Sequence, residues 1–238
     1  MKGKFYGIGV GPGDPELLTI KAKRLLEECD VIVAPKTGME KKSVALDIAK
    51  SLIGNDKEVQ ELLFPMTYDE SELEKHWDAA GDQVAAMLDD GKIVVFLTLG
   101  DPMVYSTYIY ILKRIEIKGY DTATVPGITS FCAAASRIST PLTEGNETMA
   151  VIPSAYECET LEDILTTFDN VVLMKVSRNF DQLVEKLEKL GLLKSSVLVC
   201  RCGMEDEQIE YDLQKMVGQK VNYLSMILVK RGETSEGA

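Results

Sequence analysis

The sequence predicts an α/β protein with two α/β domains. Short β-branched runs alternate with longer amphipathic segments, which is typical of strands covered by helices. The length of 238 residues suits one large domain or two modest ones. The polar, turn-rich stretch PLTEGNE at 141–147 interrupts the alternation and suits a linker. We therefore expect an N-terminal domain over 1–142 and a C-terminal domain over 143–238.

In the first domain, strands are expected at 4–10, 31–34, 59–63, 93–99 and 122–125. Leucine and isoleucine recur at helical spacing over a charged face from 17 to 26. Further helices are expected at about 43–53, 71–90 and 104–118, with a short one after Gly127. This order predicts a mostly parallel sheet covered by helices. In the second domain, strands are expected at 149–152, 171–176, 197–200 and 224–229, and helices at 161–168 and 180–190.

Charge and hydropathy exclude several classes of protein. The formal net charge is −12, which argues against broad binding of a nucleic-acid backbone or an anionic membrane surface. The longest uncharged run, 122–136, is shorter than the ~20 residues that a membrane-spanning helix needs. The N-terminus is broken by glycines and lacks a secretory cleavage pattern. We therefore expect a cytosolic protein.

Cysteine and histidine give no sign of a metal site or a disulfide scaffold. The five cysteines are an odd number without framework spacing, and Cys200 and Cys202 form a C-x-C pair with no second pair nearby. The single histidine, His76, lies in a polar helical stretch and is expected at the surface. No metal is expected, and spacing supports no histidine-based triad.

Three glycine-rich loops follow predicted strands, where ligands bind in open α/β sheets. They are Gly9–Pro15, Gly100–Ser106 and Pro126–Phe131. The first starts as G-x-G but has Asp14 where a dinucleotide fingerprint needs glycine, and no Walker A sequence occurs. An NAD enzyme and a P-loop NTPase are therefore disfavoured.

Two interpretations of the loops remain open. Asp14 and Asp101 each precede a proline and an apolar helical run, as a helix N-cap does. Alternatively, glycine lets a ligand approach the backbone, and the acidic side chains suit a cationic or hydroxyl-bearing ligand. Tyr105, Tyr108 and Tyr110 fit either a ligand wall or a half-buried helix face.

Two of the loops carry a family resemblance. The stretch GVGPGDPELLTIKAKRLLEECDVIVAP closely resembles the first signature of the tetrapyrrole methylases, and GDPMVYSTY resembles the second. The resemblance covers nearly the whole chain. It implies two α/β domains of tetrapyrrole methylase type with the ligands in a cleft between them, S-adenosylmethionine as methyl donor, and a homodimer.

Within this family the chain resembles the branch that methylates carbon 20 of precorrin-2 in corrin synthesis. The stretches that carry this likeness are LLFPMTYDE, FLTLGDPMVYSTY, TVPGITSFCAAASR, VVLMKVSR and YLSMILV. Metal-free precorrin-2 and its cobalt form both remain open as substrates. So do two other classes of protein: a related methylase acting on another tetrapyrrole carbon, on protein or on RNA, and a non-catalytic sensor of adenosyl ligands.

The resemblance also implies site residues. For the cofactor these are Gly100, Asp101, Met103, Val104, Thr129, Ser130, Met174, Gly203 and Ser225, of which Ser225 is the weakest match. The first loop corresponds to the substrate-binding part of the family, so Asp14 is a candidate for substrate binding. Since the substrate is a polycarboxylate, basic residues near strand ends are candidates for its lining: Lys36, Lys175, Arg178 and Arg201, with Lys175 and Arg178 preferred. No catalytic residue is assigned.

Overall fold

The computed structural model describes residues 2–38, 40–54, 57–153 and 155–231. The strands are β1 (Lys4–Gly9), β2 (Val31–Lys36), β3 (Glu58–Leu63), β4 (Ile93–Thr98), β5 (Asp121–Val125), β6 (Met149–Ile152), β7 (Asn170–Met174), β8 (Ser196–Cys200), β9 (Gln208–Glu210) and β10 (Ser225–Lys230). The α-helices are α1 (Ile20–Glu28), α2 (Val44–Ala49), α3 (Glu70–Asp89), α4 (Tyr108–Ile117), α5 (Ser130–Arg137), α6 (Leu161–Thr167) and α7 (Phe180–Lys189).

The chain divides into two compact units, residues 1–129 and 130–238. Each unit holds one sheet with helices, so the expected class of two α/β domains is confirmed. The division lies before α5, whereas the sequence suggested residue 142. The helix belongs to the second unit because Ala134 and Ala135 are buried against Val172 of β7 and Met226 of β10.

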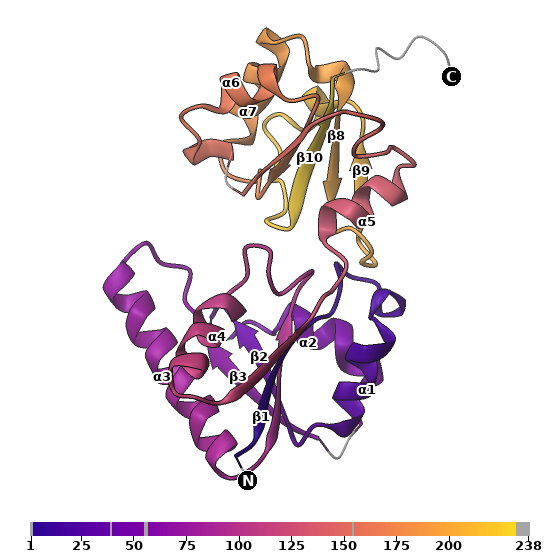
Figure 1. Cartoon of the computed structure of the whole chain (residues 1–238). Helices are drawn as coiled ribbons and strands as arrows, with labels where there is room; N and C mark the ends of the chain where they lie inside the picture. The colour runs from indigo at the N-terminus through magenta and orange to yellow at the C-terminus, as the bar shows by residue number, and fades with distance from the viewer. Residues whose placement is uncertain (1, 39, 55–56, 154, 232–238) are drawn as a thin grey trace. The chain divides into compact units, whose positions relative to one another are not determined.

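The first unit is a parallel sheet with helices on both faces. Its strand order is β3-β2-β4-β1-β5, and every pairing in it is parallel. Helices α3 and α4 cover one face, and α1 and α2 lie on the other (Figure 1). Phe5, Phe96, Leu88 and Ile111 pack in the core under α3 and α4. The predicted parallel sheet covered by helices is therefore confirmed.

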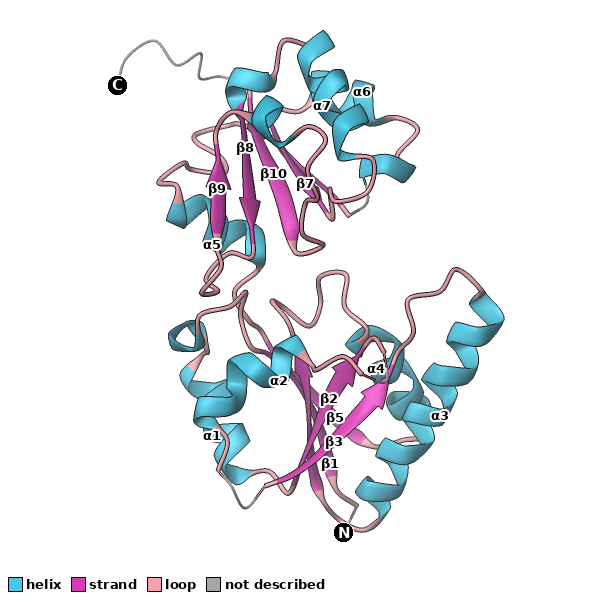
Figure 2. Cartoon of the chain, turned by 180° about the vertical axis from the view of Figure 1, so that it is seen from behind, coloured by secondary structure: helices cyan, strands magenta, loops and turns pink. Residues whose placement is uncertain are grey.

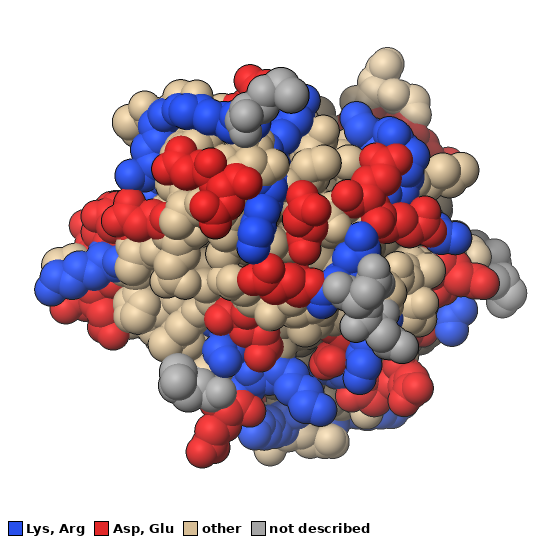
Figure 3. All heavy atoms as spheres, turned by 90° about the horizontal axis from the view of Figure 1, so that it is seen from below, with Lys and Arg blue, Asp and Glu red and all other residues tan. Residues whose placement is uncertain are grey.

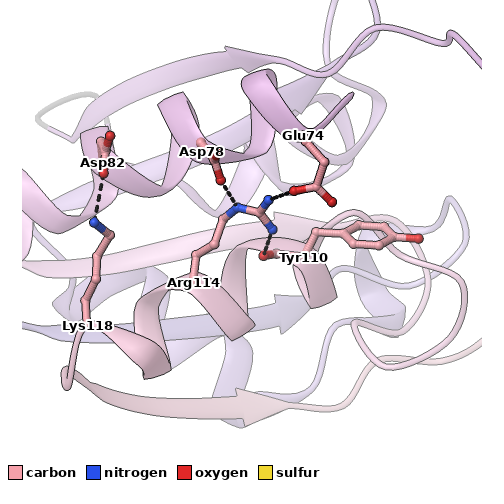
Figure 4. A network of polar contacts seen from close by, with 6 residues as sticks. All are labelled: Glu74, Asp78, Asp82, Tyr110, Arg114 and Lys118. Atoms are coloured by element: carbon pink, nitrogen blue, oxygen red, sulfur yellow. Dashed lines mark hydrogen bonds and ion pairs between the residues drawn. The ribbon is translucent and has the colours of Figure 1, made fainter. Parts of the chain in front are cut away.

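Charged contacts join α3 to α4 at the surface. Arg114 donates through Nε to Asp78 at 2.7 Å and also pairs with Glu74, and Lys118 donates to Asp82 at 2.9 Å (Figure 4). The three acidic side chains are well exposed, so each pair adds little to stability. The buried apolar faces of the two helices therefore hold them to the sheet.

The second unit has a mixed sheet in the order β6-β7-β10-β8-β9. Only β6 and β7 are parallel, while β10 runs antiparallel to both β7 and β8. Helices α6 and α7 lie on one face of this sheet, and α5 lies on the other (Figure 2). Side chains alternate between two cores, as Leu173 and Ile227 face α6 and α7 whereas Val172 and Met226 face α5.

Three elements differ from the sequence prediction. Helix α4 begins at Tyr108 rather than near residue 104, because Tyr105 has a left-handed φ of 49° that a helix cannot continue through. Strand β9 was not predicted, since its three residues are too few to show a period-two pattern. Strand β7 ends at Met174, two residues earlier than expected, where Lys175 turns into the left-handed region at φ 56°.

Tyr108 anchors α4 to the sheet. Its ring is fully buried against Phe5 and Phe96, and its hydroxyl lies 2.9 Å from Oγ1 of Thr124. Burial raises the pKa of this phenol. A Cβ added to Gly7 of β1 would lie 2.6 Å from Cε1 of the ring, so only glycine leaves room for it. Tyr108 is therefore a core residue and not part of a ligand wall.

We expect Gly7→Ala to lower the free energy of unfolding by about 1–3 kcal/mol, the usual cost of overpacking a closed core. Denaturant unfolding followed by circular dichroism measures this loss. Gly38→Ala is the matched control, because a Cβ there would lie 3.6 Å from Lys41 in ordinary contact. Equal stability of the two variants would contradict the role given to Gly7.

Candidate functional site

The three glycine-rich loops meet at the carboxyl edge of the first sheet. They follow β1, β4 and β5, which are adjacent in the strand order. The loops after β1 and β4 pair through Gly11 and Gly100, whose N–H groups donate to each other's carbonyl oxygens at 3.3 and 2.8 Å. Both glycines have left-handed φ, 77° and 73°. Three loops that are far apart in the sequence therefore lie together at one edge of the sheet.

Glycine is required where the loops touch. A Cβ on Gly9 would lie 2.5 Å from Cα of Gly127, and a Cβ on Gly127 would lie 2.7 Å from Cα of Gly9. Both added atoms would also collide with the carbonyl oxygen of Gly100. These backbones are in direct contact, so neither Gly9 nor Gly127 tolerates a side chain. Both glycines lie in the loops expected from sequence, but their contact with each other was not predicted.

Asp101 ties two of these loops together. Its Oδ1 accepts from the N–H of Met103 at 2.8 Å, and its Oδ2 accepts from the N–H of Gly127 at 2.9 Å. The N-cap interpretation is wrong for Asp101, because α4 begins seven positions later with Thr107 as its cap. The carboxylate instead fixes the loop after β4 against the loop after β5.

Asp14 has the simpler role of a cap. It precedes a single 3-10 turn, Pro15–Leu17, and its Oδ1 accepts from the N–H of Glu16 at 2.8 Å. The capping interpretation is therefore confirmed for Asp14. Its partial exposure is compatible with a ligand contact as well.

The loop after β4 presents large side chains at the surface. Met103 is 55% exposed and Tyr105 is 50% exposed, and Val104 is half-buried beside them. Tyr110 lies farther along, on α4, where it stacks on Trp77 with ring centroids 3.9 Å apart. Of the three tyrosines considered from sequence, only Tyr105 belongs to the loop. Thr129, the last residue of the first unit, has a buried hydroxyl without a hydrogen-bond partner in the described part of the chain.

The second unit gathers its candidate residues at one edge of its sheet. Met174 ends β7, Ser225 begins β10, and Gly203 follows the end of β8. Because β10 is antiparallel to both neighbours, its start lies beside their ends. The N–H of Lys175 donates to the carbonyl of Ser225 at 3.0 Å. Ser130, the first residue of α5, is the remaining candidate for cofactor binding in this unit.

The register separates two of these side chains. Met174 pairs with Met226 and packs on the α5 face. Ser225 precedes Met226, so its side chain points to the opposite face, where its hydroxyl is buried with no hydrogen-bond partner among the described residues. The edge therefore brings the backbones of Met174 and Ser225 together but not their side chains.

The loop after β8 is held by an acidic residue that the sequence analysis did not single out. Oε2 of Glu207 accepts from the N–H of Gly203 at 2.7 Å, and its Oε1 accepts from Nε of Arg137 at 2.6 Å. Burial raises the pKa of the nearby Cys202 thiol to about 11, and the Glu207 carboxylate adds to the rise. The stretch RCGMEDE does not distinguish Glu207 from its acidic neighbours. The conformation of the turn determines which carboxylate reaches the N–H of Gly203.

The four basic candidates differ in their surroundings. Lys36 pairs with Glu61 at 3.8 Å, and Arg201 pairs with Asp206. Arg178 is exposed and donates to the hydroxyl of Tyr156 at 3.3 Å, with its guanidinium 5.5 Å from the centre of that ring.

Lys175 is partly buried. This burial lowers the pKa of its ammonium group, and nearby Glu157 acts in the opposite direction. Lys175 and Arg178 follow β7 and Arg201 follows β8, so three of the four lie at the same edge of the second sheet.

One face of the molecule carries mixed charge. On the face shown in Figure 3, Lys and Arg side chains alternate with Asp and Glu, and no broad area carries a single sign. Among the described residues no trio of His, Cys, Asp or Glu is placed to hold a metal ion. Within the same ranges no helix is both long enough and apolar enough to cross a bilayer.

Solved structures share this fold. A cobalamin biosynthetic enzyme, cobalt precorrin-4 methyltransferase, matches with a TM-score of 0.73 and 25% identity, over 95% of this chain and 94% of that one. A uroporphyrin-III C-methyltransferase from Thermus thermophilus, complexed with S-adenosyl homocysteine, matches with a TM-score of 0.68 and 22% identity, over 96% and 97% of the two chains.

Sequence relatives agree. A probable cobalt-precorrin-2 C(20)-methyltransferase of Methanocaldococcus jannaschii is 36% identical, over 96% of both chains. The cobalt-precorrin-2 C(20)-methyltransferase of Salmonella typhimurium is 34% identical, over 97% of this chain and 98% of its own. The sequence model of the tetrapyrrole (corrin/porphyrin) methylases matches residues 4–216. The resemblance drawn from the two loop signatures is confirmed, and the chain belongs to the tetrapyrrole methylase family.

Proposed function

We propose that this protein transfers the methyl group of S-adenosylmethionine to carbon 20 of cobalt-precorrin-2 in corrin synthesis. The observation that carries the proposal is the similarity to two cobalt-precorrin-2 C(20)-methyltransferases at 34% and 36% identity over nearly the whole chain. Their names favour the cobalt form over metal-free precorrin-2. From the same resemblance, we propose that the enzyme is a cytosolic homodimer.

From the family resemblance, we propose nine residues as contacts of the cofactor. In the first unit these are Gly100, Asp101, Met103, Val104 and Thr129, and in the second Ser130, Met174, Gly203 and Ser225. The residues fit an adenosyl ligand: a Cβ on Gly100 would meet only the carbonyl oxygen of Ile128, at 3.9 Å, so this backbone is open to a ligand, and the buried Thr129 hydroxyl lacks a partner among the described residues. Ser225 contributes through its backbone, because its side chain faces α6 and α7.

The reaction requires no covalent intermediate with the protein. S-adenosylmethionine supplies an activated methyl group on a cationic sulfur, which a carbon nucleophile displaces in line. The chain's residues have to hold donor and acceptor in contact, at roughly 3–3.5 Å. The loops after β1, β4 and β5 are suited to holding the ligands in place, since their backbones are in direct contact with one another. Asp14 is already engaged as a cap, so we assign no general base to it.

The substrate carboxylates are proposed to meet Lys175 and Arg178. Arginine can grip a carboxylate through two parallel hydrogen bonds. The Tyr156 ring and hydroxyl support the Arg178 guanidinium, which limits the side-chain freedom lost on binding. A methylase acting on RNA is disfavoured by the formal net charge of −12 and by the mixed charge of the face shown in Figure 3.

Mass spectrometry of the product tests the function. Incubation with S-adenosylmethionine and cobalt-precorrin-2 should add one methyl group to the tetrapyrrole and release S-adenosylhomocysteine. A parallel reaction with metal-free precorrin-2 tests the choice of substrate. Faster methylation of the metal-free form would show that it, and not cobalt-precorrin-2, is the preferred substrate. A protein that binds the cofactor but methylates neither tetrapyrrole would instead be a sensor or act on another substrate.

Asp101→Asn should weaken S-adenosylhomocysteine binding by about 1–3 kcal/mol, because an amide NH₂ would oppose the N–H of Gly127 and displace the loop. Calorimetry gives the affinity, and chemical unfolding gives the stability. Asp69→Asn is the matched control: Asp69 accepts from the N–H groups of Ser71 and Glu72 at the start of α3. Asparagine caps a helix about as well as aspartate, so that variant should bind the cofactor as wild type does and lose little stability. Normal cofactor affinity in Asp101→Asn would make Asp101 purely structural.

Arg178→Ala should raise the KM for the tetrapyrrole by the equivalent of about 1–3 kcal/mol and leave the KM for S-adenosylmethionine nearly unchanged. Steady-state kinetics with both substrates varied, at low and moderate salt, measures the difference. Lys194→Ala is the control, since this exposed lysine precedes β8 at the other edge of the sheet. Unchanged kinetics in both Lys175→Ala and Arg178→Ala would show that these residues do not line the substrate site.

A further inference from the structure

Glu207 is a charged side chain held almost entirely inside the second unit. Its side chain is 12% exposed, whereas that of its partner Arg137 is 63% exposed. Burial alone would raise the pKa of this carboxyl, but the hydrogen bonds from the Gly203 N–H and Arg137 hold it below its usual range. A buried carboxylate is costly unless it is fully hydrogen-bonded, and both oxygens of Glu207 are engaged.

The loop that Glu207 holds has a demanding backbone. Arg201 and Gly203 both have left-handed φ, 52° and 77°, and for arginine this conformation is unfavourable. The N–H of Arg201 donates to the carbonyl of Leu224 at 2.7 Å, which fixes the start of the loop beside β10. The bond from Gly203 to Glu207 fixes the other end. This is the hydrogen bond that satisfies the Gly203 N–H within the described part of the chain.

We propose that Glu207 is a positioning residue, which fixes the main chain of Gly203 in the conformation that the cofactor requires. The inference rests on the proposed function, in which Gly203 contacts S-adenosylmethionine. Arg137 of α5 holds the carboxylate from its outer side. Ordering the loop before binding removes an entropy cost that the cofactor would otherwise meet. Glu207 therefore acts on cofactor affinity through Gly203 and does not touch the reacting atoms.

The test compares Glu207→Ala with Glu207→Gln. Calorimetry should show S-adenosylhomocysteine binding weakened about tenfold in the alanine variant, which leaves the Gly203 N–H unsatisfied. The glutamine variant keeps an acceptor oxygen for that N–H, so its affinity should stay within about threefold of wild type. The KM for the tetrapyrrole should be unchanged in both. Glu205→Ala, an exposed glutamate of the same loop, is the control and should bind as wild type does.

Several outcomes overturn the inference. Wild-type affinity in Glu207→Ala would do so, even if the thermal midpoint falls, and so would an equal loss of tetrapyrrole affinity. A glutamine variant as weak as the alanine variant would contradict a role through the Gly203 hydrogen bond. If Glu207→Ala does not fold, Glu207→Asp decides, because the shorter carboxylate keeps the charge but draws back from the Gly203 N–H: weaker S-adenosylhomocysteine binding supports the inference, and unchanged binding overturns it. A wild-type protein that fails to bind S-adenosylhomocysteine would count instead against the proposed cofactor.

Discussion

The candidate site of the first unit depends on backbone contact between three loops. Gly9, Gly100 and Gly127 lie so close that a single Cβ on Gly9 or Gly127 would overlap the main chain of another loop. The parallel order β4-β1-β5 delivers these loops to one edge, and the absence of side chains lets them interlock there. Asp101 then adds hydrogen bonds from Met103 and Gly127. Rigidity at this edge thus comes from main-chain packing and not from the side chains of a core.

In the second unit, the loops at the candidate edge are fixed by hydrogen bonds at the start of strand β10. Its central strand β10 is antiparallel to its neighbours, so the start of β10 lies beside the ends of β7 and β8. The chain leaves both neighbours through left-handed residues, Lys175 and Arg201, although neither is glycine. Such conformations persist only when surrounding bonds fix them. The Leu224 and Ser225 carbonyls supply those bonds by accepting from the N–H groups of Arg201 and Lys175.

Local patterns were sufficient to predict most strands and helices, because hydrophobic periodicity reports which face of an element is buried. They did not reveal the direction of β10, since alternation reads the same in parallel and antiparallel strands. They also placed the start of α4 too early, because the left-handed Tyr105 is not a glycine and gives no signal. They also gave no sign of Glu207, because its role depends on the turn that brings its carboxylate to the N–H of Gly203 and on Arg137, which lies 70 positions away in the chain. Contacts of that kind are set by the fold.

An acidic protein that handles a polycarboxylate substrate is not a contradiction, because several of its carboxylates are occupied with backbone N–H groups. Asp14, Asp69, Asp101, Asp181 and Glu207 each accept from at least one main-chain amide. A carboxylate in such a bond faces partial positive charge, which offsets part of its field at short range. Meanwhile Lys175, Arg178 and Arg201 follow strand ends on one edge of the second sheet. These nearby groups set the electrostatic potential that a ligand meets there. Salt screens the field of exposed charges that lie farther away than about 8–10 Å.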